Sequence, residues 1–243
     1  LTRFAENRIH QNVSLTSPEV SVRVLLGKRV GRATTNRLDP EALARCLQSA
    51  RSAAECQQQD PEILPLPGPQ TYRKARSYVQ RTAALSPEDR AAAIGQAVRR
   101  CKARRLRGAG KFEAASTLLA IANSKGLFAS HRSTESTFDV TVMSDDSSGW
   151  AAATHKDVRR FDPVELAGRA VEKCLRSRAP VAFEPGACTV VLEPPAVTDF
   201  LLFLAIFGFG GLACLEGRSF ASGNLGRKIL GGNVTITDDA YAA

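Results

Sequence analysis

The 243-residue sequence is poor in aromatic side chains and in histidine. Aromatic residues make up 6% of the chain, with a single Trp, so the sequence lacks the aromatic platform on which single-stranded nucleic acids stack. The histidines, His10, His131 and His155, are far apart, and none belongs to an H-E-x-x-H motif or an H-x-x-x-H pair. Such pairs place two imidazoles on one side of a helix, so the histidine pattern predicts no zinc helix.

Other catalytic and redox signatures are also missing. The chain contains no G-x-x-x-x-G-K-[ST] phosphate loop and no G-x-S-x-G nucleophile motif, so motifs alone identify no catalytic apparatus. Its six cysteines form no C-x-x-C pair, and we expect reduced thiols. Residues 1–10 include two Arg and one Glu and no apolar run, which is not a signal peptide. We therefore expect a cytoplasmic protein with no membrane partner.

Basic residues outnumber acidic ones, 33 to 24, which gives a formal net charge of +9. The densest group of cations, with Lys111 close by, comprises Arg99, Arg100, Lys102, Arg104, Arg105 and Arg107. This group could bind a polyanion such as DNA. It could equally end a helix, where the helix dipole favours cations. We favour the helix end, because no aromatic residues are interleaved with the cations.

Three segments carry the signature of a helix start. Each has a capping Asp or Ser, then Pro, then an acid within the first turn, beginning at Asp39, Ser86 and Asp162. After Ser86 and Asp162 an acid falls three residues beyond the cap, as in a capping box. An apolar stripe follows each start, so each helix is predicted to pack one face against a sheet.

Alternating apolar and polar residues predict strands elsewhere. Residues 20–35 predict a hairpin that turns near Gly27, and residues 112–154 an antiparallel meander. The proline-rich residues 60–70 predict a loop or linker, and residues 189–192 a buried strand. Together these patterns predict an α+β fold, with mixed or antiparallel sheets, packed helices and two subdomains.

The most apolar stretch, residues 200–215, carries no charge and lies between Asp199 and Glu216. It is shorter than the roughly 20 residues that a membrane-spanning helix needs. Three glycines also cluster in its second half. We expect a helix that is buried in the core or at an interface with another subunit.

Several short segments, none decisive by itself, occur in a defined order along the chain. They are residues 3–11 (RFAENRIHQ), 31–36 (GRATTN), 123–127 (NSKGL), 185–194 (PGACTVVLEP), 216–220 (EGRSF), 222–228 (SGNLGRK) and 234–239 (VTITDD). In this order they resemble the TldD/PmbA family, also called modulators of DNA gyrase, whose members pair a metallopeptidase subunit with a related partner. The resemblance implies an N-terminal α+β domain in residues 1–180 and the start of a metallopeptidase-like domain in residues 181–243. Because full-length members are longer, we expect this chain to lack much of a β-rich C-terminal domain.

The resemblance also indicates where a metal would be held. In the family's peptidase subunit, an H-E-x-x-x-H helix precedes the G-x-S segment, which here is residues 217–219. Counting back without gaps places the three motif positions at Leu202, Phe203 and Phe207. Hydrocarbon side chains neither bind zinc nor act as a general base. The resemblance therefore implies a PmbA/TldE-like member with no catalytic residues and no metal of its own.

Three functions follow from this resemblance. The first, which we favour, is a metal-free subunit that pairs with a zinc-bearing TldD-like chain, or with its own copy, and acts on flexible peptides held as an added strand. The second is a non-enzymatic protein that binds DNA or a gyrase-associated partner through residues 99–107, although we do not expect nucleic acid as a partner. The third, an active peptidase with ligands outside this sequence, is least favoured, because the family's helix would still lack ligands.

Overall fold

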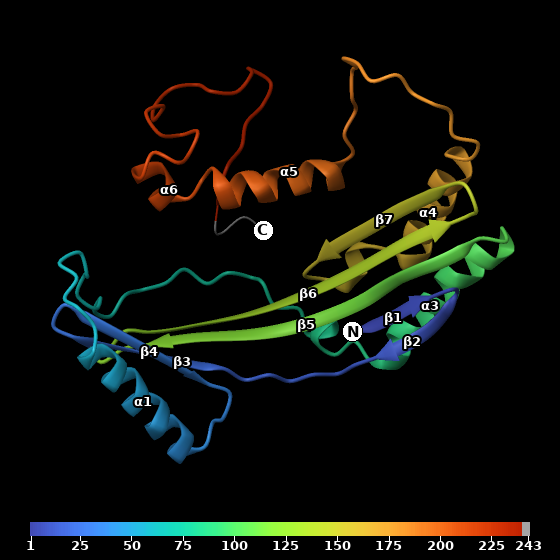
Figure 1. Ribbon diagram of the computed structural model, residues 1–243. Helices are drawn as coiled ribbons and strands as arrows, with labels where there is room; N and C mark the ends of the chain where they lie inside the picture. Colours follow the sequence, from blue (N-terminus) through green and yellow to red (C-terminus); the bar gives the residue numbers. More distant parts are fainter. Residues whose placement is uncertain (240–243) are drawn as a thin grey trace.

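The computed structural model describes residues 1–239 and shows two sheets with helices packed on them (Figure 1). The strands are β1 (Thr2–Ala5), β2 (Arg8–Asn12), β3 (Val20–Leu26), β4 (Arg29–Thr35), β5 (Arg107–Ala122), β6 (Phe128–Met143) and β7 (Ser148–His155). The helices are α1 (Pro40–Glu55), α2 (Gln80–Ala83), α3 (Pro87–Ala103), the 3-10 turn η1 (Val158–Arg160), α4 (Pro163–Arg176), α5 (Pro194–Phe207) and α6 (Gly211–Leu215). The predicted α+β class is confirmed.

The larger sheet is antiparallel, with the strand order β2-β1-β5-β6-β7. Its consecutive strands β5, β6 and β7 confirm the predicted meander. Residues 3–11, whose segment resembles the family's early strand, form a hairpin of two strands instead. Glu6 and Asn7 turn it with φ of 49° and 60°, and the Asn7 amide donates a 2.9 Å hydrogen bond to the carbonyl of Leu106. This bond attaches the hairpin to the start of β5.

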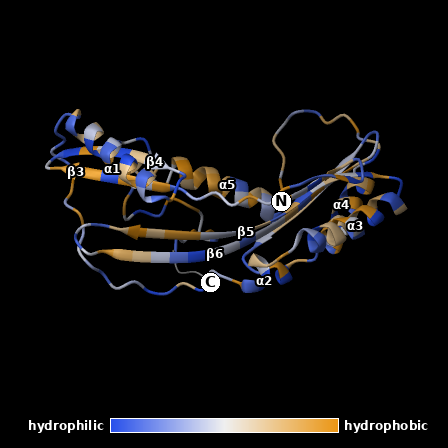
Figure 2. Cartoon of the chain, turned by 90° about the horizontal axis from the view of Figure 1, so that it is seen from below, coloured by the Kyte–Doolittle hydropathy of each residue, from blue (hydrophilic) through white to orange (hydrophobic). Residues whose placement is uncertain are grey.

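Helices α3 and α4 cover one face of this sheet and enclose the hydrophobic core (Figure 2). Phe112 from β5 and Phe138 from β6 meet edge to face in that core, with ring centroids 5.6 Å apart. α4 packs directly on β7, because a Cβ added to Gly149 would lie 2.1 Å from the carbonyl oxygen of Ala170. The core therefore depends on small residues where helix and strand touch.

All three predicted helix starts are confirmed, at α1, α3 and α4. Ser86 and Asp89 form the predicted capping box: the Asp89 N–H donates to the Ser86 hydroxyl over 3.0 Å, and the Ser86 N–H donates to the Asp89 carboxylate over 3.2 Å. The second predicted box is wrong. Asp162 caps its helix, but Glu165 pairs with Arg169 one turn later, at 2.6 Å, instead of bonding back to the cap.

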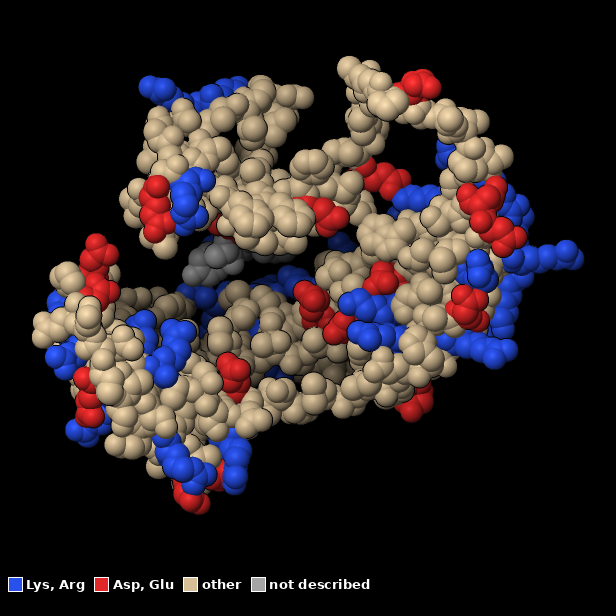
Figure 3. All heavy atoms as spheres, viewed as in Figure 1, with Lys and Arg blue, Asp and Glu red and all other residues tan. Residues whose placement is uncertain are grey.

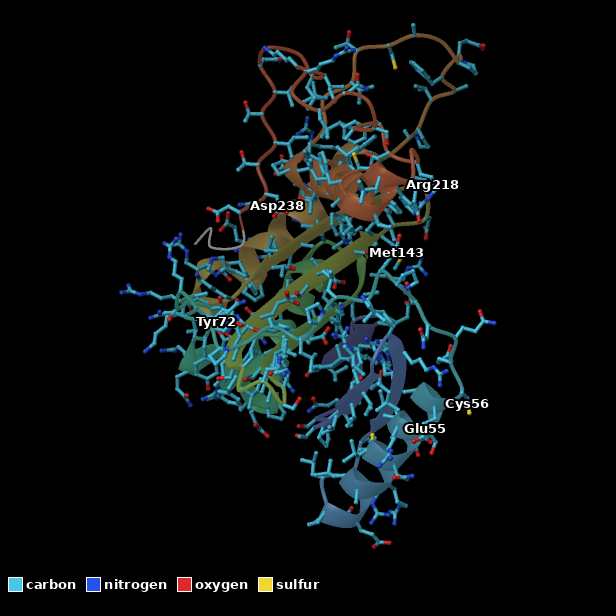
Figure 4. All side chains as sticks on the ribbon, turned by 90° about the vertical axis from the view of Figure 1, so that its left-hand side faces the viewer. Glu55, Cys56, Tyr72, Met143, Arg218 and Asp238 are labelled. Atoms are coloured by element: carbon cyan, nitrogen blue, oxygen red, sulfur yellow. The ribbon has the colours of Figure 1, made fainter. Side chains whose placement is uncertain are left out.

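A smaller unit consists of the β3–β4 hairpin and α1. Gly27 makes the predicted turn, with φ of 60°. The predicted linker in residues 60–70 is confirmed, because residues 56–79 contain no helix or strand. In Figure 4, α1 lies below the larger sheet, and the segment that contains Arg218 lies above it.

The residues after α4 depart most from expectation. The predicted buried strand at residues 189–192 is wrong, since Val191 is 91% exposed and no strand of the described chain lies there to pair with it. The predicted apolar helix of residues 200–215 is two helices, α5 and α6, with a break at residues 208–210. No side chain of α5 is buried within the described structure, so the core interpretation is wrong there and the interface interpretation stays a prediction. None of the described helices is both long and apolar enough to span a bilayer.

Candidate functional site

Helix α5 carries the three positions at which the resemblance places zinc ligands. Leu202, Phe203 and Phe207 are all exposed, and the two Phe rings stack with centroids 6.2 Å apart. Phe203 and Phe207 line an apolar hollow of about 410 Å³ together with Phe220. Asp199 is the one charged residue of α5. Figure 3 shows the surface of this helix as largely uncharged. This helix offers no imidazole and no pair of carboxylates, so it does not fit a zinc ion.

The rest of residues 1–239 also lacks a metal site, with no group of three or more His, Cys, Asp or Glu side chains placed to hold an ion. His10 lies in β2, His131 in β6 and His155 at the end of β7. Nδ1 of His155 accepts a 2.9 Å hydrogen bond from the backbone N–H of Asp157, which is a local contact. All six cysteines are free thiols.

The predicted polyanion-binding residues lie at the end of α3, in the turn that follows it and at the first residue of β5. They are Arg99, Arg100, Lys102, Arg104, Arg105 and Arg107, and all are exposed. Arg107 shares a hollow of about 430 Å³ with Asp145 and Asp146 of the β6–β7 turn. The helix-end position and the neighbouring acids support the interpretation as a helix end, and polyanion binding stays a prediction.

Helix α5 stands over the sheet face opposite α3 and α4 (Figure 2), and the part of that face beside the start of α5 carries the polar residues Lys111, Thr137 and Asp139. Side chains alternate along β6, so Asp139 faces this side while its neighbours Phe138 and Val140 enter the core. A hollow of about 660 Å³ lies between the face and the start of α5. The polar and aromatic residues that line it are Lys111, Thr137, Asp139, Trp150, Thr154, Thr198 and Asp199. We call this space the acidic hollow.

The charges of the acidic hollow are not balanced within it. Lys111 forms its ion pair with Glu113, at 3.1 Å. Neither Asp139 nor Asp199 forms an ion pair with another described residue. Partial burial raises the pKa of Asp139, and the nearby charge of Lys111 only partly opposes this. A cation entering the hollow would therefore find two carboxylates that form no ion pair with a described residue, although Lys111 already attracts Asp139.

Strand β7 forms one edge of the sheet beside this hollow. The carbonyl of His155 points toward β6, where it accepts a 2.8 Å hydrogen bond from the Ser136 hydroxyl. The carbonyl of Ser148 points away from β6 and accepts a 2.9 Å hydrogen bond from the hydroxyl of Ser177, which follows α4. Backbone groups of alternate residues point to opposite edges of a strand. The even-numbered residues 148–154 therefore direct their N–H and C=O groups away from β6.

A second hollow, of about 470 Å³, lies on the other face of β7, against α4. We call it the α4 hollow. Its charged residues pair with acids or bases nearby: Arg169 with Glu165, Arg176 with Glu172, and Lys173 with Glu193. Ala152, Pro194 and Pro195 line both hollows. The edge of β7 thus has one hollow on each face, and the two differ in charge.

Three family models match the chain, one after another. Residues 1–54 match PmbA/TldA metallopeptidase domain 1, residues 67–178 the central domain, and residues 185–243 the C-terminal domain. The chain belongs to the PmbA/TldD family. These models describe three domains, and the predicted division into residues 1–180 and 181–243 stays a prediction.

Solved structures of this family share the fold. A proposed modulator of a DNA gyrase from Thermotoga maritima superposes with a TM-score of 0.79 at 19% identity, over 93% of this chain and 53% of its own length. TldE from Thermococcus kodakarensis gives 0.77 at 17% identity, over 93% and 52%. An uncharacterized protein from Methanocaldococcus jannaschii is 27% identical over 48% of this chain and 27% of its own length. The chain therefore spans about half the length of the solved structures and about a quarter of this relative.

Sequence reasoning did not identify the acidic hollow or the β7 edge. Alternation in β6 marked Asp139 as the polar neighbour of core residues, and this was the one local signal. Lys111, Trp150 and Asp199 join Asp139 only through strand register and the return of the chain at α5. The assignment of the family's zinc-helix positions to Leu202, Phe203 and Phe207, by contrast, comes from the resemblance alone and stays a prediction.

Proposed function

We propose that this chain is a metal-free, TldE-like subunit of a TldD/TldE-type metallopeptidase complex that acts on flexible peptides. The observation that carries the proposal is the hydrocarbon character of Leu202, Phe203 and Phe207 at the family's zinc positions. A zinc-bound water and a general base need nitrogen and oxygen ligands that these residues do not supply. The zinc and the bond-breaking chemistry would then belong to a TldD-like partner.

The exposed apolar surface of α5 supports the partnership. Phe200, Phe203 and Phe207 are exposed on a helix with no buried side chain in the described structure. Contiguous apolar surface of this kind marks sites of protein interaction. In the proposed complex, the TldD-like partner would cover this surface.

Co-expression with a TldD-like protein that carries the H-E-x-x-x-H helix tests the proposal. After the two chains are purified together and then separated, we expect about one zinc per partner chain and none on this chain. Cleavage of an unfolded peptide should require both chains. As a control, changing the Glu of the partner's motif to Gln should abolish cleavage and leave the complex intact.

Stoichiometric zinc on this chain alone would contradict the proposal. A stable homodimer that cleaves peptides without any partner would contradict it as well. DNA binding with a salt dependence that disappears when Arg99, Arg100, Arg104 and Arg105 become Ala would instead favour the DNA-binding alternative.

A further inference from the structure

We propose that the edge of β7 binds an extended peptide as an added antiparallel strand and that the acidic hollow selects basic side chains of that peptide. The inference rests on the proposed function for the substrate class, a flexible peptide. It adds where on this chain the peptide binds, in which register it pairs with β7, and which peptide side chains are preferred. Asp139, Asp199 and Trp150 are the residues that would set the preference.

The edge of β7 has free backbone groups. Trp150, Ala152 and Thr154 direct their N–H and C=O groups outward, and no backbone hydrogen bond joins them to any element beyond the sheet in residues 1–239. Pro194 and Pro195 stand beside both hollows. Proline has no N–H to donate, so these two residues cannot complete the ladder. A free edge with a pocket on each face is the arrangement that peptide-binding sheets use.

The register of an added strand decides which peptide side chains face the acidic hollow. In an antiparallel pair, residues that exchange both backbone hydrogen bonds lie opposite each other and place their side chains on the same face. Trp150 and Ala152 line the acidic hollow. Peptide residues bonded to them would therefore extend their side chains into the acidic hollow, and the intervening residues would face the α4 hollow.

The charges favour a cation in the acidic hollow. Asp139 and Asp199 lack ion-pair partners among the described residues, and burial already disfavours the ionised form of Asp139. The Trp150 ring is 44% exposed and can stack against an ammonium or guanidinium group. The chain as a whole carries a net charge of +9, so long-range electrostatics would repel a basic peptide. Binding of a basic peptide would therefore show that the carboxylates of the acidic hollow attract it more strongly than the net charge of the chain repels it.

A second copy of this chain fits the edge less well. Its own β7 (SGWAAATH) contains neither Lys nor Arg, so pairing of two β7 edges would leave the carboxylates of the acidic hollow without cations. The α4 hollow, whose charges are already paired, gives no reason to prefer a charged side chain there. An extended peptide with basic residues at alternate positions matches both hollows.

Trp150 is the single tryptophan of the chain, so its fluorescence reports the acidic hollow directly. We would titrate the full chain with an acetylated, amidated eight-residue peptide of alternating Lys and Thr. We expect a saturable fluorescence change, and binding at least about tenfold weaker for the matching Glu–Thr peptide. Asp139→Asn combined with Asp199→Asn should weaken Lys–Thr binding by at least about tenfold. Asp145→Asn combined with Glu62→Gln, an equal charge change outside the acidic hollow, should leave binding unchanged.

N-methylated peptides test the register on the unmodified protein, so this arm does not depend on the folding of any variant. N-methylation of the Lys residues removes the donors that face β7 and should abolish binding. N-methylation of the Thr residues should leave binding intact. Equal effects of the two modifications, tighter binding of the Glu–Thr peptide, or a β7-paired dimer that the Lys–Thr peptide does not dissociate would overturn the proposal. These measurements need neither zinc nor a partner, so they can fail while the metal assignment stands, and the reverse also holds.

Discussion

The chain up to α4 closes its own hydrophobic core, whereas the residues after α4 leave nearly all of their apolar side chains exposed. Phe4, Phe112 and Phe138 are buried between the sheet and its two helices. In the described residues beyond α4, Ala213 is the only buried hydrophobic residue. Both regions contain Phe and Leu side chains, so the presence of these residue types does not by itself decide which side chains are buried.

The contrast shows that apolar character and burial are independent properties of a segment. α4 has a one-sided stripe that its own sheet covers, while α5 is apolar on all sides and touches little of the chain. A helix that is apolar all round is stable when protein surrounds it. This difference supports an interface role for α5, in agreement with the proposed pairing.

Substitution of one aromatic residue in each region gives the largest expected effect. Phe138→Ala should lower the free energy of unfolding by about 3–5 kcal/mol, because the fully buried ring leaves a cavity. Phe203→Ala, on a side chain that is 59% exposed, should change it by less than about 0.5 kcal/mol. Urea unfolding followed by circular dichroism measures both. Equal losses would show that α5 is part of the cooperative core.

A pair of glycines gives a smaller contrast. Gly149→Ala should cost about 1–3 kcal/mol, since the added Cβ would lie 2.1 Å from the Ala170 carbonyl oxygen and force α4 away from β7. Gly186→Ala meets no atom within 4 Å and should have almost no effect. Thermal unfolding of the two variants compares them. A stable Gly149→Ala protein would mean that α4 does not pack against β7 as closely as described.

The smallest effect concerns pH. Burial raises the pKa of Asp139 above its ordinary value of 3.8, so its ionised form opposes folding at neutral pH and the penalty is relieved as pH falls through the raised pKa. Asp139→Asn should therefore stabilise the protein at pH 7 by up to about 0.5 kcal/mol, and the gain should disappear below pH 3.8.

Asp146, near the junction of the two regions, should behave in the opposite way. The backbone N–H of Ala179 lowers its pKa, so its contribution is present above the ordinary value and is lost as pH falls through the lowered pKa. Asp146→Asn should accordingly destabilise the protein at pH 7. Unfolding measured between pH 3 and pH 7 tests both substitutions, and the same sign for the two would contradict the assigned causes.

Much of the fold could be predicted because its determinants are local. Asp39, Ser86 and Asp162 cap helices through bonds to residues within one turn. Gly27 supplies the positive φ of a hairpin turn. The failures involve longer range: residues 189–192 have strand-like composition, but a strand also needs a neighbour, and none is present in the described chain.

The sequence by itself determined the helix starts, the meander and the hydrocarbon side chains at Leu202, Phe203 and Phe207, because each depends on residue types at short spacing. The tertiary structure decided which strand forms the sheet edge and which charges meet beside it. Asp139 and Trp150 come from paired strands, and Asp199 is brought over them by the long connection after α4. Their proximity depends on strand register and on the return of the chain at α5. Contacts between residues so distant in the sequence produce no repeating residue pattern from which they could be predicted.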